Sequence, residues 1–257
     1  MPPASTRRVG GIALVSSLIW ATSIAAQTPP PYPLAPEYDP GADRHFVLPT
    51  GRVGPGGTGA AGMGGLLEPS LATPFVNVSP LPRVSVGATT ALVPGLLDRV
   101  PVFGAVTVQP VRYGPLDGSV TVVGASSLGG NADVTLAAVL GSLSYGTDVF
   151  RVTAASGSLG GLAAGHRFGA VGIDAEIDRG EPSVAVVAGE PRTVRRRVKL
   201  IGEVYFAGGD ASDGAVGLLG LRFSEPGYWV NLGVPFVVGG GGASAVWLPI
   251  VSFGVAF

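Results

Sequence analysis

Apolar side chains alternate with small or polar ones, at a period of two, in many short stretches of this chain. In the stretch 247–257, bulky apolar side chains at every second position include Val251, Phe253, Val255 and Phe257. The positions between them carry smaller side chains such as Ser252, Gly254 and Ala256. The stretches 83–92, 197–208, 214–224 and 227–237 repeat this pattern. A period of two with one apolar face predicts β-strands.

The second face of these strands decides the class of fold. It consists mostly of Gly, Ala, Ser and Thr with an occasional charge. A soluble β-sandwich would bury its apolar face and carry many charges on the other. Small and polar side chains instead suit the crowded inside of a narrow barrel, with the bulky face turned to lipid. A closed barrel also leaves no strand edge unpaired in hydrocarbon. We therefore expect an all-β protein, an antiparallel transmembrane β-barrel, with a soluble all-β sandwich as the alternative.

The pattern predicts about 12 strands, with 10–14 possible. The expected strands are 57–66, 73–79, 83–92, 101–110, 118–127, 134–145, 148–157, 182–190, 197–208, 214–224, 227–237 and 247–257. Short connections such as 80–82, 146–147 and 225–226 alternate with longer ones such as 93–100 and 208–214, as a barrel with short periplasmic turns requires. We place the stretch 158–181 in an outside loop, although a further strand or hairpin there would make fourteen.

The composition and net charge of the chain exclude several classes of protein and of chemistry. The chain of 257 residues is 46% hydrophobic and 13% charged, with a net charge of −1, which excludes a disordered protein. This charge also gives no reason to expect a nucleic-acid partner. The absence of cysteine excludes disulfides, a thiol nucleophile and thiolate metal ligands.

The N-terminus has the parts of a cleaved signal peptide. Arg7 and Arg8 precede the apolar stretch GGIALVSSLIWA, and SIAAQ offers small residues for cleavage near Ala25 or Ala26. We expect residues 1–26 to be the signal peptide, 27–50 a Pro-rich periplasmic leader and 51–257 the barrel. The alternatives are a membrane-anchoring helix for the first segment and a partner-binding motif for the second.

The final strand resembles the C-terminal strand of Gram-negative outer-membrane β-barrel proteins. The matching positions are Val251, Phe253, Val255 and Phe257, with Trp247 at the level of an interfacial aromatic residue. The layout is also similar to small porin-like barrels. This resemblance implies a location in the cell outer membrane, in contact with outer-membrane lipid. It further implies that the barrel-assembly machinery reads these four residues as an assembly signal. Nothing in the sequence specifies a solute or an oligomeric state.

Candidate chemistry is sparse. His45 lies in the expected leader, and His166 precedes Asp174, Glu176 and Asp178 without a serine in a nucleophile motif. The Gly-rich stretch 51–65 lacks the Lys-Ser/Thr ending of a nucleotide-binding loop. We therefore expect no enzyme, no catalytic residues, no metal and no cofactor, with a lipid-modifying enzyme as the third hypothesis. The basic cluster RTVRRRVK is expected at a periplasmic turn, as solvated charges or as a contact to anionic headgroups or peptidoglycan.

The charges inside the expected strands are the most informative ones. By parity, five of them fall on the small, polar face: Arg83, Arg151, Lys199, Glu203 and Arg222. A charge on the lipid face near the bilayer centre would cost about 2–4 kcal/mol, so we place these residues in the lumen. They form either a charged constriction of a passive channel for small solutes or an ion-pair network filling a non-conducting structural or surface-interaction barrel.

Overall fold

The computed structural model describes residues 44, 49–66, 71–92, 100–128, 135–160, 166–187, 190–207, 214–225, 227–239, 242–245 and 249–257. Among these residues, no helix is long and apolar enough to cross a membrane. The strands are β1 (Thr58–Leu66), β2 (Ala72–Leu81), β3 (Val84–Thr90), β4 (Val100–Tyr113), β5 (Leu116–Leu128), β6 (Thr135–Gly146), β7 (Phe150–Leu159), β8 (His166–Arg179), β9 (Ser183–Val187), β10 (Glu190–Val194), β11 (Arg197–Ala207), β12 (Ala215–Glu225), β13 (Tyr228–Gly239), β14 (Gly242–Ala245) and β15 (Ile250–Ala256).

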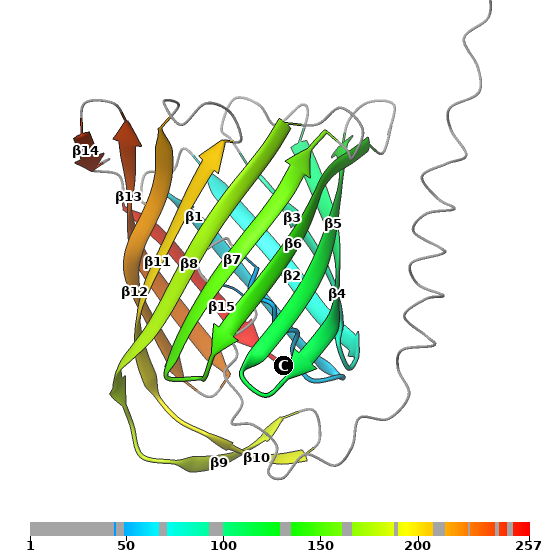
Figure 1. The fold of residues 1–257 in the computed structure, drawn as a ribbon. Helices are drawn as coiled ribbons and strands as arrows, with labels where there is room; N and C mark the ends of the chain where they lie inside the picture. Colours follow the sequence, from blue (N-terminus) through cyan, green and yellow to red (C-terminus); the bar gives the residue numbers. More distant parts are fainter. Residues whose placement is uncertain are drawn as a thin grey trace, which may run out of the picture. The chain divides into compact units, whose positions relative to one another are not determined.

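Twelve of these strands form one closed antiparallel barrel, whose strands we call the wall (Figure 1). The wall runs from β1 to β8, continues through β11, β12, β13 and β15, and returns to β1. The backbones of Gly59 and Phe257 exchange two hydrogen bonds, of 2.7 and 2.9 Å, beside this closing pair of strands. The short β14 pairs with the end of β13, and β9 pairs with β10 in a separate hairpin. The predicted all-β antiparallel barrel of about twelve strands is confirmed.

One strand assignment is wrong. The stretch 158–181, which we expected in an outside loop, contributes β8 to the wall, whereas the expected wall strand 182–190 belongs to the β9–β10 hairpin. The hairpin strands have five residues each, and a tilted strand needs about 9–11 residues to span a bilayer. The stretch 158–181 had been taken for one long connection between two expected strands, but β8 crosses the wall and Asp174 on it is buried on the inner side.

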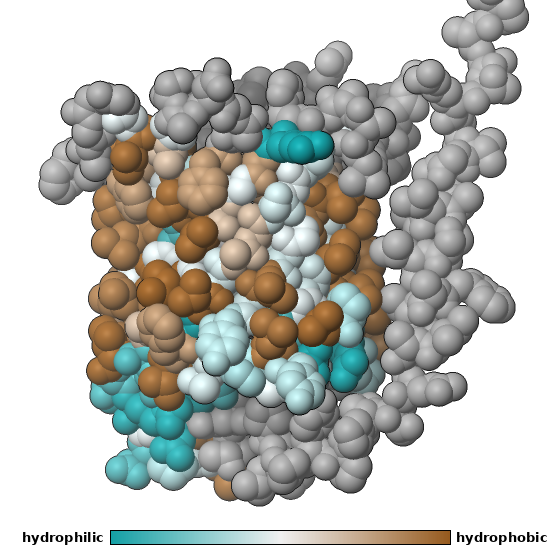
Figure 2. Space-filling view, viewed as in Figure 1, coloured by the Kyte–Doolittle hydropathy of each residue, from teal (hydrophilic) through white to brown (hydrophobic). Residues whose placement is uncertain are grey.

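The wall is apolar outside and polar inside. Phe253, Val255 and Phe257 point outward with roughly half of their surface exposed (48%, 55% and 61%). Leu219 and Leu232 are also exposed, whereas the polar side chains of alternate positions are buried in the barrel. Figure 2 shows apolar residues spread over the visible outer face, with hydrophilic ones gathered at the lower left. This distribution is the reverse of that in a soluble protein.

The two ends of the barrel differ in their connections. We call the end with the short connections 82–83, 114–115, 147–149 and 226–227 the turn end. The β9–β10 hairpin and the end of β15 lie there too (Figure 1). At the opposite end, which we call the loop end, the wall strands that follow one another in the sequence are β1 and β2, β3 and β4, β5 and β6, β7 and β8, β11 and β12, and β13 and β15.

Candidate functional site: the barrel lumen

A piece of chain that precedes β1 lies inside the barrel near the turn end. We call Pro49–Val53 the inner segment; Thr50 and Val53 within it are almost fully buried. Inward side chains of three strands bind its backbone: Gly51 N donates to Ser144 Oγ (2.8 Å), Val53 N to Gln109 Oε1 (3.2 Å) and Ser119 Oγ to Thr50 O (3.1 Å). The inner segment crosses the expected boundary at residue 50 between leader and barrel.

Gly51 packs closely against the backbone of the wall. A Cβ atom at this position would lie 2.2 Å from the carbonyl oxygen of Asp117 on β5. Real Cβ atoms do not approach a backbone oxygen so closely, so the segment sits in this place only with glycine at position 51.

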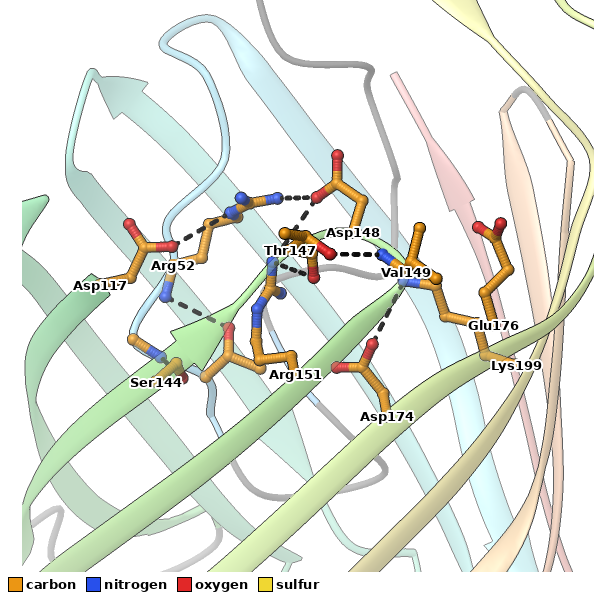
Figure 3. Close-up of polar contacts among 12 residues, drawn as sticks. Arg52, Asp117, Ser144, Thr147, Asp148, Val149, Arg151, Asp174, Glu176 and Lys199 are labelled. Carbon is orange, nitrogen blue, oxygen red and sulfur yellow. Dashed lines mark hydrogen bonds and ion pairs between the residues drawn. The ribbon is translucent and has the colours of Figure 1, made fainter. Parts of the chain in front are cut away.

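Arg52 ties the inner segment to two carboxylates, as Figure 3 shows. Its Nε lies 3.4 Å from Asp117 Oδ2, and its Nη1 donates to Asp148 Oδ1 at 2.5 Å. Asp117 also accepts a hydrogen bond of 2.8 Å from Gln109 Nε2. Arg52 therefore bridges the strand β5 and the β6–β7 turn.

Asp148 in that turn has a shifted pKa. Burial by itself raises the pKa of this carboxyl, but the guanidinium groups of Arg52, Arg197 and Arg151 outweigh burial and lower the pKa below the ordinary value of 3.8. Since the folded-state pKa is depressed, ionised Asp148 stabilises the fold at neutral pH. That stabilisation is lost as the pH falls below 3.8 and through the folded-state value.

Further ion pairs continue around the inside of the wall, and we call this group the charged layer. Its pairs are Arg52 with Asp117 and Asp148, Arg151 with Asp148 (3.6 Å), Lys199 with Asp174 (3.4 Å), Arg197 with Glu176 (3.5 Å) and Arg179 with Glu176 (2.6 Å). They come from the inner segment, from β5, β7, β8 and β11 and from the β6–β7 turn. Charges of both signs thus lie on neighbouring strands, so that each member of the charged layer has an opposite charge beside it.

A polar chain on the other side of the lumen also reaches the residues before β1. Arg222 Nε donates to Asn231 Oδ1 (2.8 Å), and Asn231 Nδ2 donates to Ser252 Oγ (2.9 Å). Arg222 Nη1 further donates to the carbonyl oxygen of Arg44 (2.9 Å). The guanidinium of Arg44 lies 5.1 Å from the ring centre of Phe75 on β2, a cation–π distance.

Four of the five charges that we placed in the lumen are buried inside the barrel. Arg151, Lys199, Glu203 and Arg222 are each at most 2% exposed. Arg83 is different, because it lies in the β2–β3 turn with a φ of 69° and is only half-buried. Whether the four buried charges act as a constriction stays a prediction.

Sequence reasoning missed the acidic partners of these charges and the inner segment. Asp174 and Glu176 went unassigned because β8 was taken for a loop; the alternation of Ala170, Gly172 and Asp174 with Val171 and Ile173 would have revealed them. Within the basic cluster, Arg197 and Lys199 turn into the lumen, whereas Arg196 pairs with Asp178 in solvent. Among the described residues, no cluster of His, Asp and Glu could hold a metal ion.

A cavity of about 570 Å³ lies on the loop-end side of the charged layer. Its apolar wall comes from inward side chains of six strands: Phe75, Phe103, Leu140, Phe168, Leu218 and Ile250. The inner segment contributes Pro49, Arg52 and Val53 to the lining. The lumen is therefore charged near the turn end and largely apolar farther in.

No protein-family model matches the chain, and no curated protein matches it. A solved porin structure, NanC in a rhombohedral crystal form, superposes with a TM-score of 0.44 at 11% sequence identity, over 77% of this chain and 98% of that chain. The strand pairing of the chain itself defines its class, a closed twelve-stranded antiparallel β-barrel with an apolar outside and a partly charged inside.

Proposed function

We propose that this protein is an outer-membrane β-barrel with a porin-like path for small solutes, held closed near the turn end by the inner segment. The exposed apolar outer face, which only lipid would cover at low cost, supports the membrane location. The expected signal peptide and the resemblance of the last strand suggest export and insertion by the barrel-assembly machinery.

The inner segment is the observation that favours a gated channel. It is held by three hydrogen bonds and the Arg52 ion pairs, whereas the wall is held by continuous ladders. A net contribution of about 1 kcal/mol for each hydrogen bond makes displacement of the segment feasible while the wall stays intact. Planar-bilayer recording of the refolded protein tests this proposal: rare single-channel steps are expected, and more frequent ones once the inner segment is displaced.

The second candidate function is a non-conducting structural or surface-interaction barrel. The near-complete burial of Arg151, Lys199, Glu203 and Arg222 favours it, because charges in a lumen filled by side chains are shielded from water, whereas charges lining an open lumen face it. A barrel that stays silent after displacement of the inner segment would support this candidate.

We expect the protein to fractionate with the outer membrane and to migrate in gels with heat-modifiable mobility. The reason is that the closed ladder resists detergent until it is heated, while the apolar face keeps the protein in lipid. Fractionation of expressing cells and gels of unheated samples measure this. Recovery as a soluble periplasmic protein would contradict the proposal.

Deleting Phe257 should lower the yield of folded barrel in cells several-fold. The deletion removes both the proposed assembly signal and the backbone hydrogen bonds between residue 257 and Gly59. Phe257→Ala keeps those backbone bonds, so it isolates the ring, and Ser252→Ala is the control inside the lumen. Equal folded yields from Phe257→Ala and Ser252→Ala would show that the ring is not read as a signal.

A further inference from the structure

The lumen cavity has a lining that a water-filled pore would not need. Water-filled barrels carry a polar interior, because water at an apolar wall is unfavourable. Here Leu140, Ala155 and Ala170 form a buried apolar cluster with Phe168 and Tyr205 packed against it. Ile201 and Leu218 form a second cluster, which Ile250 covers.

Three pairs of polar side chains in this lining bind each other. Thr107 Oγ1 lies 2.9 Å from Thr121 Oγ1, and Ser85 Oγ donates to Asn77 Oδ1 at 2.6 Å. Asn231 is bound between Arg222 and Ser252. Because these groups bind within the wall, an occupant of the cavity need not supply hydrogen bonds to them.

A second cavity, of about 550 Å³, continues the first one toward the loop end. Both cavities have Phe168 and Tyr205 in their walls, so these two rings lie between them. The second cavity is lined by Leu159, Val216 and Val237 on the inward face of β7, β12 and β13. It is also lined by Phe206 and Val238, which lie on the outward face and are exposed, so this cavity lies at the rim of the wall. Among the described residues, apolar side chains therefore line both the rim cavity and the cavity next to the inner segment, and the two cavities meet at Phe168 and Tyr205.

We propose that the lumen binds an uncharged, mainly apolar small molecule, which enters from the loop end past Phe168 and Tyr205. The cavity volume of about 570 Å³ lies within the range of about 300–1,000 Å³ that holds drug-sized ligands. Its apolar wall with few polar groups is typical of such sites. The inference rests on the proposed membrane location but not on conduction, because a closed barrel can hold the same ligand.

Trp229 offers a direct measurement of binding, because it lines the cavity and is 2% exposed. We would use the mature chain with Trp247→Phe, refolded in lipid vesicles, and add 1-bromonaphthalene, an apolar aromatic quencher that acts on contact. Saturable quenching of Trp229 fluorescence is expected. The charged 4-bromobenzenesulfonate should quench several-fold less. No saturable quenching by 1-bromonaphthalene, or equal quenching by both probes, would overturn the proposal.

Two matched substitutions test whether the probe binds in the cavity. Ala105→Phe fills it from the inner side of β4, whereas Ala154→Phe adds the same ring to the outer face of β7. We expect about a tenfold loss of 1-bromonaphthalene affinity for Ala105→Phe and an unchanged affinity for Ala154→Phe. Ala138→Leu is the second inner variant if Ala105→Phe does not fold. Equal affinities of folded inner and outer variants would overturn the site.

Entry of the probe past Phe168 is tested separately, by the rate at which quenching begins. Phe168→Ala should speed the onset of quenching several-fold, since this ring lies between the two cavities. An unchanged onset in Phe168→Ala would overturn entry past this ring. If the barrel shows no conductance in bilayers but does show saturable quenching, the proposed binding site stands and only the proposed channel function is contradicted.

Discussion

Asp174→Asn is expected to lower the free energy of unfolding by about 3 kcal/mol, the cost of removing one partner from a buried ion pair. Asp174 lies 3.4 Å from Lys199 Nζ, and both side chains are at most 7% exposed. The carboxylate also interacts electrostatically with Arg151. Neutral asparagine leaves both cations in the charged layer with less negative charge beside them. Thermal and denaturant unfolding of the refolded barrel, followed by heat-modifiable mobility, measure the loss.

Asp178→Asn is the matched control for this loss. It is the same substitution on the same strand, but its ion pair with Arg196 has both side chains more than half exposed (57% and 59%). A pair in solvent contributes at most about 1 kcal/mol, so a small change is expected. The double variant Asp174→Asn/Lys199→Met should recover part of the loss, because it removes the cation together with its partner.

The comparison of Asp174→Asn with Asp178→Asn also tests whether water reaches the charged layer. If water filled the lumen at this level, Asp174→Asn would be as mild as Asp178→Asn, because water would screen the remaining cations. Equal stabilities of the two variants would therefore contradict a buried layer and favour an open constriction.

The alternation of side chains predicted most of the wall because it is a local property of each strand. The outward row Val251, Phe253, Val255 and Phe257 could be predicted in this way, since neighbouring positions in a strand must face opposite sides. The same parity placed Lys199 in the lumen without any knowledge of its partner Asp174.

The two features that the sequence did not predict, β8 and the inner segment, were missed for other reasons. β8 was missed because the stretch 158–181 was taken for one long connection, and the cations of β7 and β11 that pair with its acids lie on other strands. The inner segment has no periodic pattern, and its position depends on contacts between distant residues, such as Gly51 with Ser144, 93 positions away. A pattern within a short window carries no information on such a contact.

Gly51→Leu is expected to open the barrel. The Cβ of any larger residue would lie 2.2 Å from the backbone oxygen of Asp117, so the inner segment cannot keep its place. Weakening its binding by about 2 kcal/mol would raise the population without the segment in the lumen about thirty-fold. Single-channel events in planar bilayers should therefore become far more frequent than in the wild-type protein.

The control for Gly51→Leu is Gly104→Leu, the same substitution on the outer side of β4, where an added Cβ meets no atom within 4 Å. Arg52→Gln removes the ion pairs with Asp117 and Asp148 without adding bulk, and it should open the barrel to a smaller extent. Heat-modifiable mobility confirms that each variant is folded before recording. If folded Gly51→Leu and Arg52→Gln both show as few single-channel events as the Gly104→Leu control, the proposed channel function is wrong. The buried charges would then serve to fill a non-conducting barrel, because displacing the segment that closes the lumen would have revealed no path through it.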